Sequence, residues 1–505
     1  MLEMQLIKKF KLLIAASRHA LRVTYHDMNK GVLFMKTILF ILPALQEVLS
    51  AKFRQIKYSL FPPLSLLTLA GLVPPDKYNL IVRDEHVEDV FIDEPVDLVV
   101  MTVYISSAKR AYEIGKYYRE KGAKIFMGGI HPSTMREEAM LHADSICIGP
   151  GESVFLQILS DFETNNLQKI YYGDKLTDLS EIPLARRDLM NRDKYLVPNT
   201  VVASRGCLYN CDFCYKKSFW GEDYYKFRPL EDIKKELDTF KQRFVFFLDD
   251  NLMGNRIEAR KIFRLLKEYN FIWQAAASID VAYSRGFLEE AYDCGCRSLF
   301  VGFESISKDN MKNSNKIQNQ KYDYIDAIKR FHDAGIMLNG SFVYGLDCDG
   351  PEVFEKTLEF AIKNKIETAT FHIFTPFPGT KLFEKLQNEG RILHYKWEEY
   401  DTRHAVFQPA LMSPEKLEEG YWESYEKFYS YSSIFARSAG LTNPLKRILY
   451  NISWKKVDGL WNFIIKNNLL RFIMPVFESV LAKNTKACVS EKVEWSKTEM
   501  LYSEG

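Results

Sequence analysis

The chain has 505 residues, 47% hydrophobic and 27% charged, and a formal net charge of +2, ordinary values for a globular protein of two or three domains. The near-neutral charge gives no reason to expect a nucleic-acid-binding protein. The sequence contains no run of about twenty uncharged apolar residues, so no membrane-spanning helix is predicted. The 8 cysteines are few for this length, which favours a reducing cytoplasm over a secreted, disulfide-stapled protein.

Residues 1–35 are predicted to be an N-terminal extension. They contain the basic, partly apolar stretch LIKKFKLLIAA, but they lack the long apolar core of a signal peptide. Two interpretations stay open. The segment is either an upstream extension before a later start methionine or a basic amphipathic helix that touches a membrane.

Residues 36–173 are predicted to form a Rossmann-like α/β domain. Strand-like runs begin with KTILFILPAL and recur roughly every twenty residues as YNLIVRDE, VDLVVMTVYIS, AKIFMGGIHP and ADSICIGPGES, with helical patterns between them. This alternation predicts a parallel sheet, whose ligands bind beyond the carboxyl ends of the strands. Small residues follow several of these strands, so we expect a mononucleotide-like or corrinoid ligand there.

Residues 174–198 are polar and irregular and are predicted to be a linker. Six further strand-like runs lie within residues 199–400, separated by helical segments, and they predict a partial βα barrel of the TIM type. Chemistry in such barrels sits at the carboxyl ends of the strands. The residues found there are Cys207, Asp249, Asp250, Asn251, Ser278, Asp280 and Glu304.

Residues 401–505 are predicted to be a helical C-terminal domain. Tyr421, Tyr425 and Phe428 recur at helical spacing, which favours core packing, with an aromatic wall of a substrate pocket as the alternative. Residues 460–481 read as an amphipathic helix, packed on the protein or lying on a membrane surface. Within the barrel, His372 and Tyr344 are candidates for acid–base work, and core packing is the alternative for each.

Three of the cysteines, Cys207, Cys211 and Cys214, are spaced C-x3-C-x2-C directly after the first barrel strand. Three thiolates on one loop can hold a cubane iron–sulfur cluster and leave one iron without a protein ligand. An open coordination position is typical of a catalytic metal centre. The alternative is a zinc site completed by Cys294 and Cys296 or by a histidine.

The sequence CLYNCDFC, at the end of the first strand of a predicted partial barrel, resembles the cluster loop of radical S-adenosylmethionine (SAM) enzymes. The resemblance implies a 4Fe–4S cluster on the three cysteines, SAM bound to the open iron, and reductive cleavage to a 5′-deoxyadenosyl radical. It also implies a reducing partner such as a flavodoxin or ferredoxin. LDDN stands where the family often has a glycine-rich stretch. The positions that match SAM contacts are Phe213, Asp249, Asp250, Asn251, Ser278 and Glu304.

The N-terminal motifs FPPLSLLTLAGLVP, RDEHVEDV and MGGIHPSTMREEAMLHADSICIGPGES resemble the cobalamin-binding domain of the cobalamin-dependent subclass, which includes hopanoid C-2 methylase and its relatives. Many such domains carry a D-x-H-x-x-G motif whose histidine binds cobalt, but this chain reads LPALQEVLSA there. We expect cobalamin without a histidine ligand, and a cobalamin-type fold that binds no corrinoid is the alternative. The candidate cobalamin-binding residues are Thr102, Ser106, Gly128, Gly129, Gly149, Gly151 and Glu152.

The resemblance implies a cytoplasmic radical SAM enzyme that transfers methyl to an unactivated carbon of a lipid or natural product. One alternative is radical carbon–carbon bond formation or rearrangement without methyl transfer. An RNA methylthiotransferase is a more remote alternative, because those enzymes have an N-terminal cluster, whereas the first cysteine here is Cys147. A corrinoid or iron–sulfur carrier module is the non-enzyme alternative. The amphipathic segments raise peripheral contact with the inner membrane face.

Overall fold

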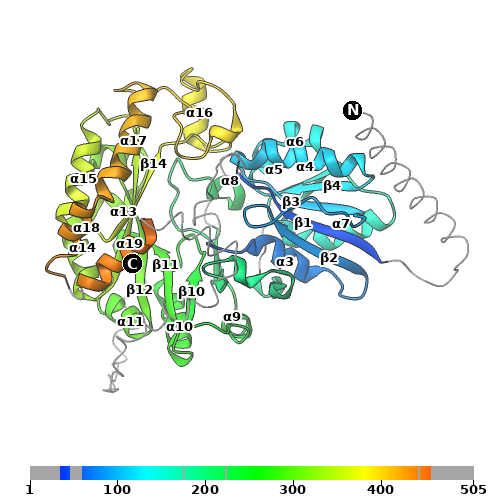
Figure 1. Cartoon of the computed structure of the whole chain (residues 1–505), viewed down its shortest axis with the longest axis horizontal. Helices are drawn as coiled ribbons and strands as arrows, with labels where there is room; N and C mark the ends of the chain where they lie inside the picture. Colours follow the sequence, from blue (N-terminus) through cyan, green and yellow to red (C-terminus); the bar gives the residue numbers. More distant parts are fainter. Residues whose placement is uncertain are drawn as a thin grey trace, which may run out of the picture.

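The computed structural model describes residues 35–45, 60–174, 176, 178–221, 224–441 and 444–455. Two parallel α/β units stand side by side, the first in blue and cyan and the second in green and yellow (Figure 1). The predicted fold class, a Rossmann-like domain followed by a partial βα barrel and helices, is confirmed. Almost all of the predicted N-terminal extension and the whole amphipathic segment 460–481 lie outside the described residues.

The N-terminal sheet has six parallel strands in the order β2-β1-β3-β4-β5-β6. Its order reverses between β1 and β3, and in open sheets a ligand crevice forms outside the carboxyl ends at such a reversal. The strands are β1 (Lys36–Leu42), β2 (Tyr78–Asp84), β3 (Leu98–Thr102), β4 (Lys124–Gly128), β5 (Ser145–Ile148) and β6 (Ile170–Tyr172).

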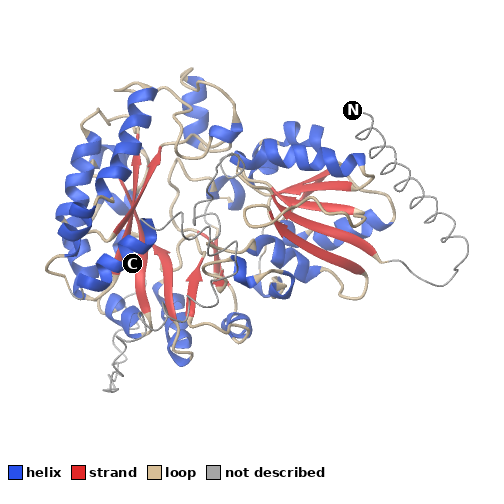
Figure 2. Cartoon of the chain, in the orientation of Figure 1, coloured by secondary structure: helices blue, strands red, loops and turns tan. Residues whose placement is uncertain are grey.

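Helices cover both faces of this sheet, as Figure 2 shows. The central strands are buried on both faces, and β3 is a continuous run of buried apolar residues, which is typical of a parallel sheet. One apolar core lies under α3 and α7, and the other lies under α4 and α6. The helices are α3 (Leu64–Leu72), α4 (Ala108–Glu120), α5 (Ile130–Thr134), α6 (Arg136–His142) and α7 (Phe155–Glu163).

The second sheet is an open barrel of six parallel strands in the order β14-β13-β12-β11-β10-β7. Its outer edges are β7 and β14, so the barrel is partial, as expected. The strands are β7 (Thr200–Val201), β10 (Phe244–Phe247), β11 (Ile272–Ala277), β12 (Cys296–Glu304), β13 (Met337–Tyr344) and β14 (Thr368–Ile373).

The first barrel strand differs from the single run TVVASRG that the sequence predicts. It leaves the sheet after Val201, and Ser204–Gly206 (β8) pairs instead with Tyr225–Phe227 (β9) in an antiparallel hairpin. The buried carboxylate of Asp249 holds this bend, because it accepts hydrogen bonds from the backbone N–H groups of Ala203 and Ser204. The bend carries the following cysteine loop over the mouth of the barrel.

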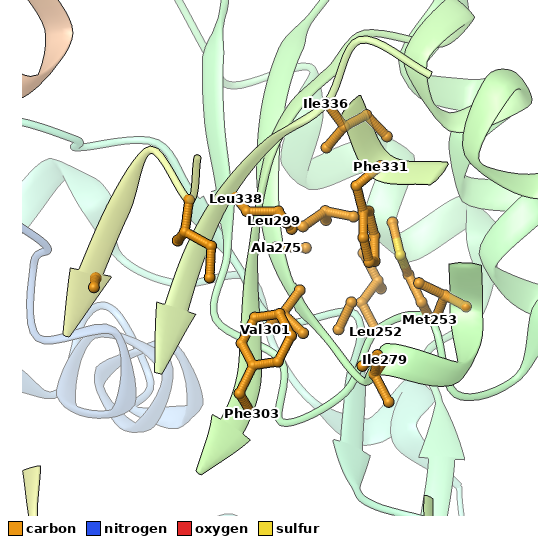
Figure 3. Packing of buried hydrophobic residues seen from close by; sticks show 14 of the residues in the cluster. Leu252, Met253, Ala275, Ile279, Leu299, Val301, Phe303, Phe331, Ile336 and Leu338 are labelled. Atoms are coloured by element: carbon orange, nitrogen blue, oxygen red, sulfur yellow. The ribbon is translucent and has the colours of Figure 1, made fainter. Parts of the chain in front are cut away.

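Helices pack on the outer face of the barrel sheet, where alternate strand residues point. Leu299, Val301 and Phe303 of β12 lie in this outer core with Phe331 of α14 (Figure 3). Burying such side chains stabilises the fold by roughly 1.5–3 kcal/mol each. The helices are α9 (Leu230–Leu237), α10 (Arg256–Glu268), α11 (Phe287–Asp293), α12 (Lys308–Asn313), α13 (Ile317–Gln320), α14 (Tyr324–Asp333), α15 (Val353–Lys363) and α16 (Lys381–Asn388).

The described C-terminal helices are α17 (Pro414–Phe428), α18 (Tyr431–Ser438) and α19 (Pro444–Lys455). Of these helices, α17 belongs to this same outer core, whereas α18 contacts α15 and α17, and α19 contacts α18. The Tyr425 hydroxyl donates to the Phe371 carbonyl on β14, and Tyr421 and Phe428 are buried beside it. The aromatic stripe is therefore core packing on the outside of the barrel, and the substrate-wall alternative is wrong.

Two segments join the halves of the molecule. Helix α8 (Lys216–Trp220), directly after the cysteine loop, lies between the two sheets (Figure 1). The segment after α16 returns to the N-terminal domain, where Trp397 and Tyr400 are buried in the core under α4. Across the described part of the chain, no helix is long and apolar enough to cross a membrane.

Candidate active site

The cysteine loop lies at the mouth of the barrel, with all three thiols free. Its turn is closed by the Cys214 N–H, which donates to the Cys211 carbonyl at 3.0 Å. Amide donors approach two of the sulfurs: Asn251 Nδ2 lies 3.9 Å from Cys207 Sγ, and Gln318 Nε2 lies 3.8 Å from Cys211 Sγ. Such donors stabilise the thiolate form and tune the potential of an iron–sulfur cluster.

Burial raises the pKa of Cys211 to about 11, although the charge of Lys316 opposes this shift. Burial also raises the pKa of Cys214. Both thiols are therefore protonated at neutral pH in the metal-free chain. A metal must displace these protons, so cluster assembly would release them.

The zinc alternative does not fit the structure. Cys296 opens β12 on the outer face of the sheet, and Cys294 lies just before it at the end of α11, whereas the cysteine loop lies beyond the opposite strand ends. Among the residues that the structure describes, no three His, Cys, Asp or Glu side chains could hold a single metal ion. A cubane cluster has a different requirement, because each thiolate binds a different iron atom.

The three polar residues of LDDN occupy three different environments. Asp249 is buried and supports the bend after β7; burial raises its pKa to about 6, and hydrogen bonds from Ser204 and Ala203 oppose the shift. Asp250 pairs with Lys216 Nζ at 2.9 Å. Only Asn251 reaches the cysteine loop, and its amide also lies 3.5 Å from the Ser278 hydroxyl.

Glu304, the last residue of β12, points into the barrel with an unusual backbone. Its φ of +60° is in the left-handed region, which is rare for a residue other than glycine and concentrates at functional sites. Its carboxylate pairs with the buried ammonium of Lys316 and accepts a hydrogen bond from the Ser341 hydroxyl at 3.4 Å. The structure thus brings Glu304, Asn251 and Ser278 to the same mouth as the cysteines.

The two acid–base candidates lie on opposite faces of the sheet. His372 points inward from β14, where its Nδ1 lies 3.1 Å from the Thr402 hydroxyl and burial lowers its pKa. Tyr344 points outward from β13 and stacks on Phe371 with ring centroids 5.6 Å apart. Strand residues of the same parity share a face, so Tyr344 belongs to the outer core and its candidacy is wrong.

Phe213 lies beside a second cavity, of about 260 Å³, behind the cysteine loop. Its ring packs edge-on against Phe374, with centroids 5.9 Å apart. Asn310 and Leu346 also line this space. The lining combines two aromatic rings and two leucines with amide and charged side chains, and adenine contact by Phe213 stays a prediction.

A larger cavity, of about 290 Å³, lies between the two domains. Its barrel side includes Arg205, Tyr215, Trp220 and Asp250, which flank the cysteine loop. Ser106, the remaining cobalamin candidate, is not among the residues that line it. The cobalamin candidates that do line it are Thr102, Gly128, Gly129, Gly149, Gly151 and Glu152.

The glycines of this cavity are there for steric reasons. Gly129 has a φ of +102°, and a Cβ there would lie 2.9 Å from the Val103 carbonyl oxygen. Gly149 has a φ of +84°, and its Cβ would lie 2.8 Å from the Gly173 carbonyl oxygen. A backbone stripped of side chains allows a large ligand to approach closely. These residues therefore fit a corrinoid.

Charge and histidine placement complete the cavity. Arg205 reaches across the domains to Glu152 at 3.1 Å, and Lys216 pairs with Asp250, so both cations are neutralised. No histidine lines the cavity among the described residues. His131, on the short helix α5 that follows the glycines, is fully buried, and its Nε2 lies 2.7 Å from the Tyr112 hydroxyl.

Sequence reasoning missed several of these residues. Lys316, directly before α13, and Gln318, on α13, approach the cysteine loop from about a hundred positions away. Only spatial proximity connects them to the thiols, so no local motif could have found them. Arg205 stands two positions before Cys207, and its basic charge beside the cysteine loop was a local clue.

A model of the radical SAM superfamily matches residues 201–361, and a model of the B12 binding domain matches residues 59–159. The chain carries a radical SAM domain and a B12-binding domain. A model of a domain of unknown function matches residues 380–487. The family recognised from the sequence is confirmed, and it implies a 4Fe–4S cluster, SAM and cobalamin as cofactors.

Similar proteins share this combination. The chain is 28% identical over 391 residues to bacteriochlorophyllide d C-12(1)-methyltransferase of Chlorobaculum tepidum, covering 75% of this chain and 85% of that protein. It is 25% identical over 352 residues to hopanoid C-2 methylase of Rhodopseudomonas palustris, covering 66% of each. The solved structure of the radical SAM methyltransferase TsrM from Kitasatospora setae, with cobalamin and a [4Fe-4S] cluster, matches with a TM-score of 0.53 at 14% identity, covering 70% of this chain and 75% of that one.

Proposed function

We propose that this radical SAM enzyme methylates an unactivated carbon of a small apolar molecule or lipid with the help of cobalamin. One observation carries the proposal: the glycine loops of the B12-binding domain and the residues that flank the cysteine loop open onto the same cavity. A methyl donor on one wall and a radical source near the other would meet the same substrate. The similar bacteriochlorophyllide and hopanoid enzymes, which are named as methyltransferases, support this reading.

The residues at the barrel mouth would bind the iron–sulfur cluster. Cys207, Cys211 and Cys214 would hold the cluster, and Asn251 and Gln318 would donate hydrogen bonds to its sulfur ligands. When bound, the cluster with SAM supplies a radical that removes hydrogen from carbon, and cobalamin supplies the methyl group. An electron from a flavodoxin-type or ferredoxin-type donor is part of the proposal.

The remaining proposed contacts belong to SAM, the corrinoid and the substrate. Ser278, Glu304 and Phe213 would contact SAM, since they lie at the barrel mouth or behind the cysteine loop. The cavity glycines would let the corrinoid approach the backbone. His372, neutral and pointing into the barrel, would offer its free edge to a polar group of the substrate.

The cavity walls favour an uncharged substrate. The lining Arg205 is paired with Glu152 and the lining Asp250 is paired with Lys216, so no net charge is left to attract an ion. Aromatic side chains of Tyr215, Phe219 and Trp220 form much of the barrel wall. Such a surface binds apolar or conjugated molecules by burying their apolar surface and stacking against their rings rather than by charge.

Product analysis tests the proposal. Anaerobically reconstituted protein should hold iron and cobalt and, with an apolar substrate and a reductant, should form S-adenosylhomocysteine together with 5′-deoxyadenosine. Formation of 5′-deoxyadenosine alone, with a substrate that changes without gaining methyl, would show radical rearrangement or carbon–carbon bond formation and would overturn methyl transfer. Absence of cobalt binding would overturn the role of the N-terminal domain.

A further inference from the structure

The loop after β4 has two sides with different partners. On one side Gly128 and Gly129 line the cavity between the domains. On the other side His131 is fully buried, and its backbone N–H donates to the Val103 carbonyl at 3.1 Å. The contacts that hold His131 therefore also fix the position of Gly128 and Gly129.

A directed chain of hydrogen bonds holds that side. The Tyr112 hydroxyl lies 2.7 Å from His131 Nε2 and 3.0 Å from Glu138 Oε1, and it has one proton to give. Burial alone would raise the pKa of Glu138, but His131, Trp397 and Tyr112 lower it to about 2, so this carboxylate is ionised and only accepts. Tyr112 must donate to Glu138, and His131 Nε2 must donate to Tyr112.

The second oxygen of Glu138 is bonded from the other half of the molecule. Trp397 Nε1 donates to Glu138 Oε2 at 2.8 Å across a sequence separation of 259 residues. Trp397 lies in the segment that returns from the barrel after α16, is 7% exposed, and packs edge-on against the His131 ring with centroids 5.9 Å apart. Glu138 therefore accepts one hydrogen bond from each side of the domain junction.

A second joint ties the same loop to the cysteine side. Thr134, at the end of α5, lies so close to Gly379 that a Cβ on this glycine would be 2.7 Å from its methyl carbon. The Gly379 carbonyl accepts a hydrogen bond from the Ser218 hydroxyl on α8, which directly follows the cysteine loop. The glycine loop is thus seated on the barrel at two points.

We propose that Glu138 is a positioning residue that seats the glycine loop of the cavity against the barrel, so that corrinoid affinity depends on the Glu138–Trp397 contact between the domains. The inference rests on the proposed function, because it assumes that the corrinoid occupies this cavity. The contact needs a carboxylate, since two acceptor oxygens face two donors. A glutamine of the same shape has one oxygen and one NH2 group, so one of the two donors would meet a donor.

The test is a visible-absorbance titration of the full chain with hydroxocobalamin, together with iron content and thermal unfolding. We expect Glu138→Gln to weaken hydroxocobalamin binding about tenfold, since a hydrogen bond to a charged group is worth about that much. Trp397→Phe keeps the ring but removes the N–H, and it should weaken binding a few-fold. Iron content should stay unchanged in both variants. Glu138→Asp, which keeps two oxygens, should recover part of the affinity.

Two matched controls isolate the contact. Glu137→Gln changes the exposed neighbour, which pairs with Arg136 on the surface, and Trp422→Phe changes an exposed tryptophan of α17. Both should bind hydroxocobalamin like the wild type. Wild-type affinity in Glu138→Gln and Trp397→Phe, even with a lower melting temperature, would mark a purely structural role and overturn the inference alone. A wild-type chain that binds no hydroxocobalamin would instead overturn the proposed function, and the inference with it.

Discussion

The barrel mouth and the B12-binding wall of the central cavity are built from different chemistry. The barrel mouth offers polar side chains beside the cavity: three thiols, the amides of Asn251 and Gln318, and the charges of Glu304 and Lys316. The B12-binding wall is mostly apolar and includes bare backbone at Gly128, Gly129, Gly149 and Gly151. A cluster needs specific donor atoms, whereas a large organic ligand needs shape and room. Losses should therefore be abrupt on the barrel side and graded on the other.

Removing one thiol should give the largest effect. Cys211→Ala leaves the loop with two ligands, so iron content should fall to background and SAM cleavage should drop by more than about 100-fold, the upper range for changes outside the ligands themselves. Iron assay and 5′-deoxyadenosine formation measure this. Cys348→Ala, at an exposed cysteine, is the control and should retain both. Hydroxocobalamin binding should be unchanged in Cys211→Ala. Iron retained at the wild-type level in this variant would contradict the cluster assignment.

On the B12-binding wall, Gly129→Ala and Gly122→Ala form a matched pair. Both glycines have a positive φ, so Gly122→Ala should lower the free energy of unfolding by about 1–2 kcal/mol, and Gly129→Ala should lower it by more because its Cβ also meets backbone atoms. A Cβ at Gly122 would meet no atom within 4 Å, whereas a Cβ at Gly129, which lines the cavity, would lie 2.9 Å from the Val103 carbonyl oxygen. Only Gly129→Ala should also weaken hydroxocobalamin binding, by about tenfold. Equal affinities in the two variants would remove Gly129 from the corrinoid site.

The sequence predicted these two walls unequally well. Cysteines are rare and their spacing is local, so the cluster loop was visible in eight consecutive residues. The glycines were visible because strand ends converge in a parallel sheet. Contacts across long separations were not predictable: Asp249 reaches back to Ser204, and Trp397 reaches Glu138. The direction of the Tyr344 side chain could have been predicted from the sequence, because residues two positions apart on a strand, such as Phe342 and Tyr344, point to the same face.

The buried carboxylate behind the barrel wall should give a pH-dependent effect of intermediate size. Burial raises the pKa of Asp249 to about 6, above the value of about 3.9 in an unfolded chain. Between these values the folded state binds the proton more tightly, so the free energy of unfolding falls as pH rises from about 4 to 6, by up to about 2–3 kcal/mol.

Asp249→Asn should remove this pH-dependent fall in the free energy of unfolding. The substitution also removes hydrogen bonds, and their loss should lower the free energy of unfolding equally at every pH. Denaturant unfolding of both proteins at several pH values gives the difference between them as a function of pH. Asp349→Asn is the positive control, because burial likewise raises the pKa of Asp349 to about 6. A difference between Asp249→Asn and wild type that does not vary with pH would mean that Asp249 is ionised throughout.

The smallest effect should separate the inner and outer faces of the barrel sheet. The Tyr344 hydroxyl is buried in the outer core beside Ser424, whose hydroxyl already donates to the Gly420 carbonyl, so Tyr344→Phe should change the free energy of unfolding by about 1 kcal/mol or less and leave methyl transfer unchanged. His372→Gln, on the inner face of the neighbouring strand, should instead raise the KM for substrate with little change in stability. Loss of activity in Tyr344→Phe together with full activity in His372→Gln would mean that the substrate binds on the outer face of the sheet. That outcome would invert the assignment of faces and with it the position of the site.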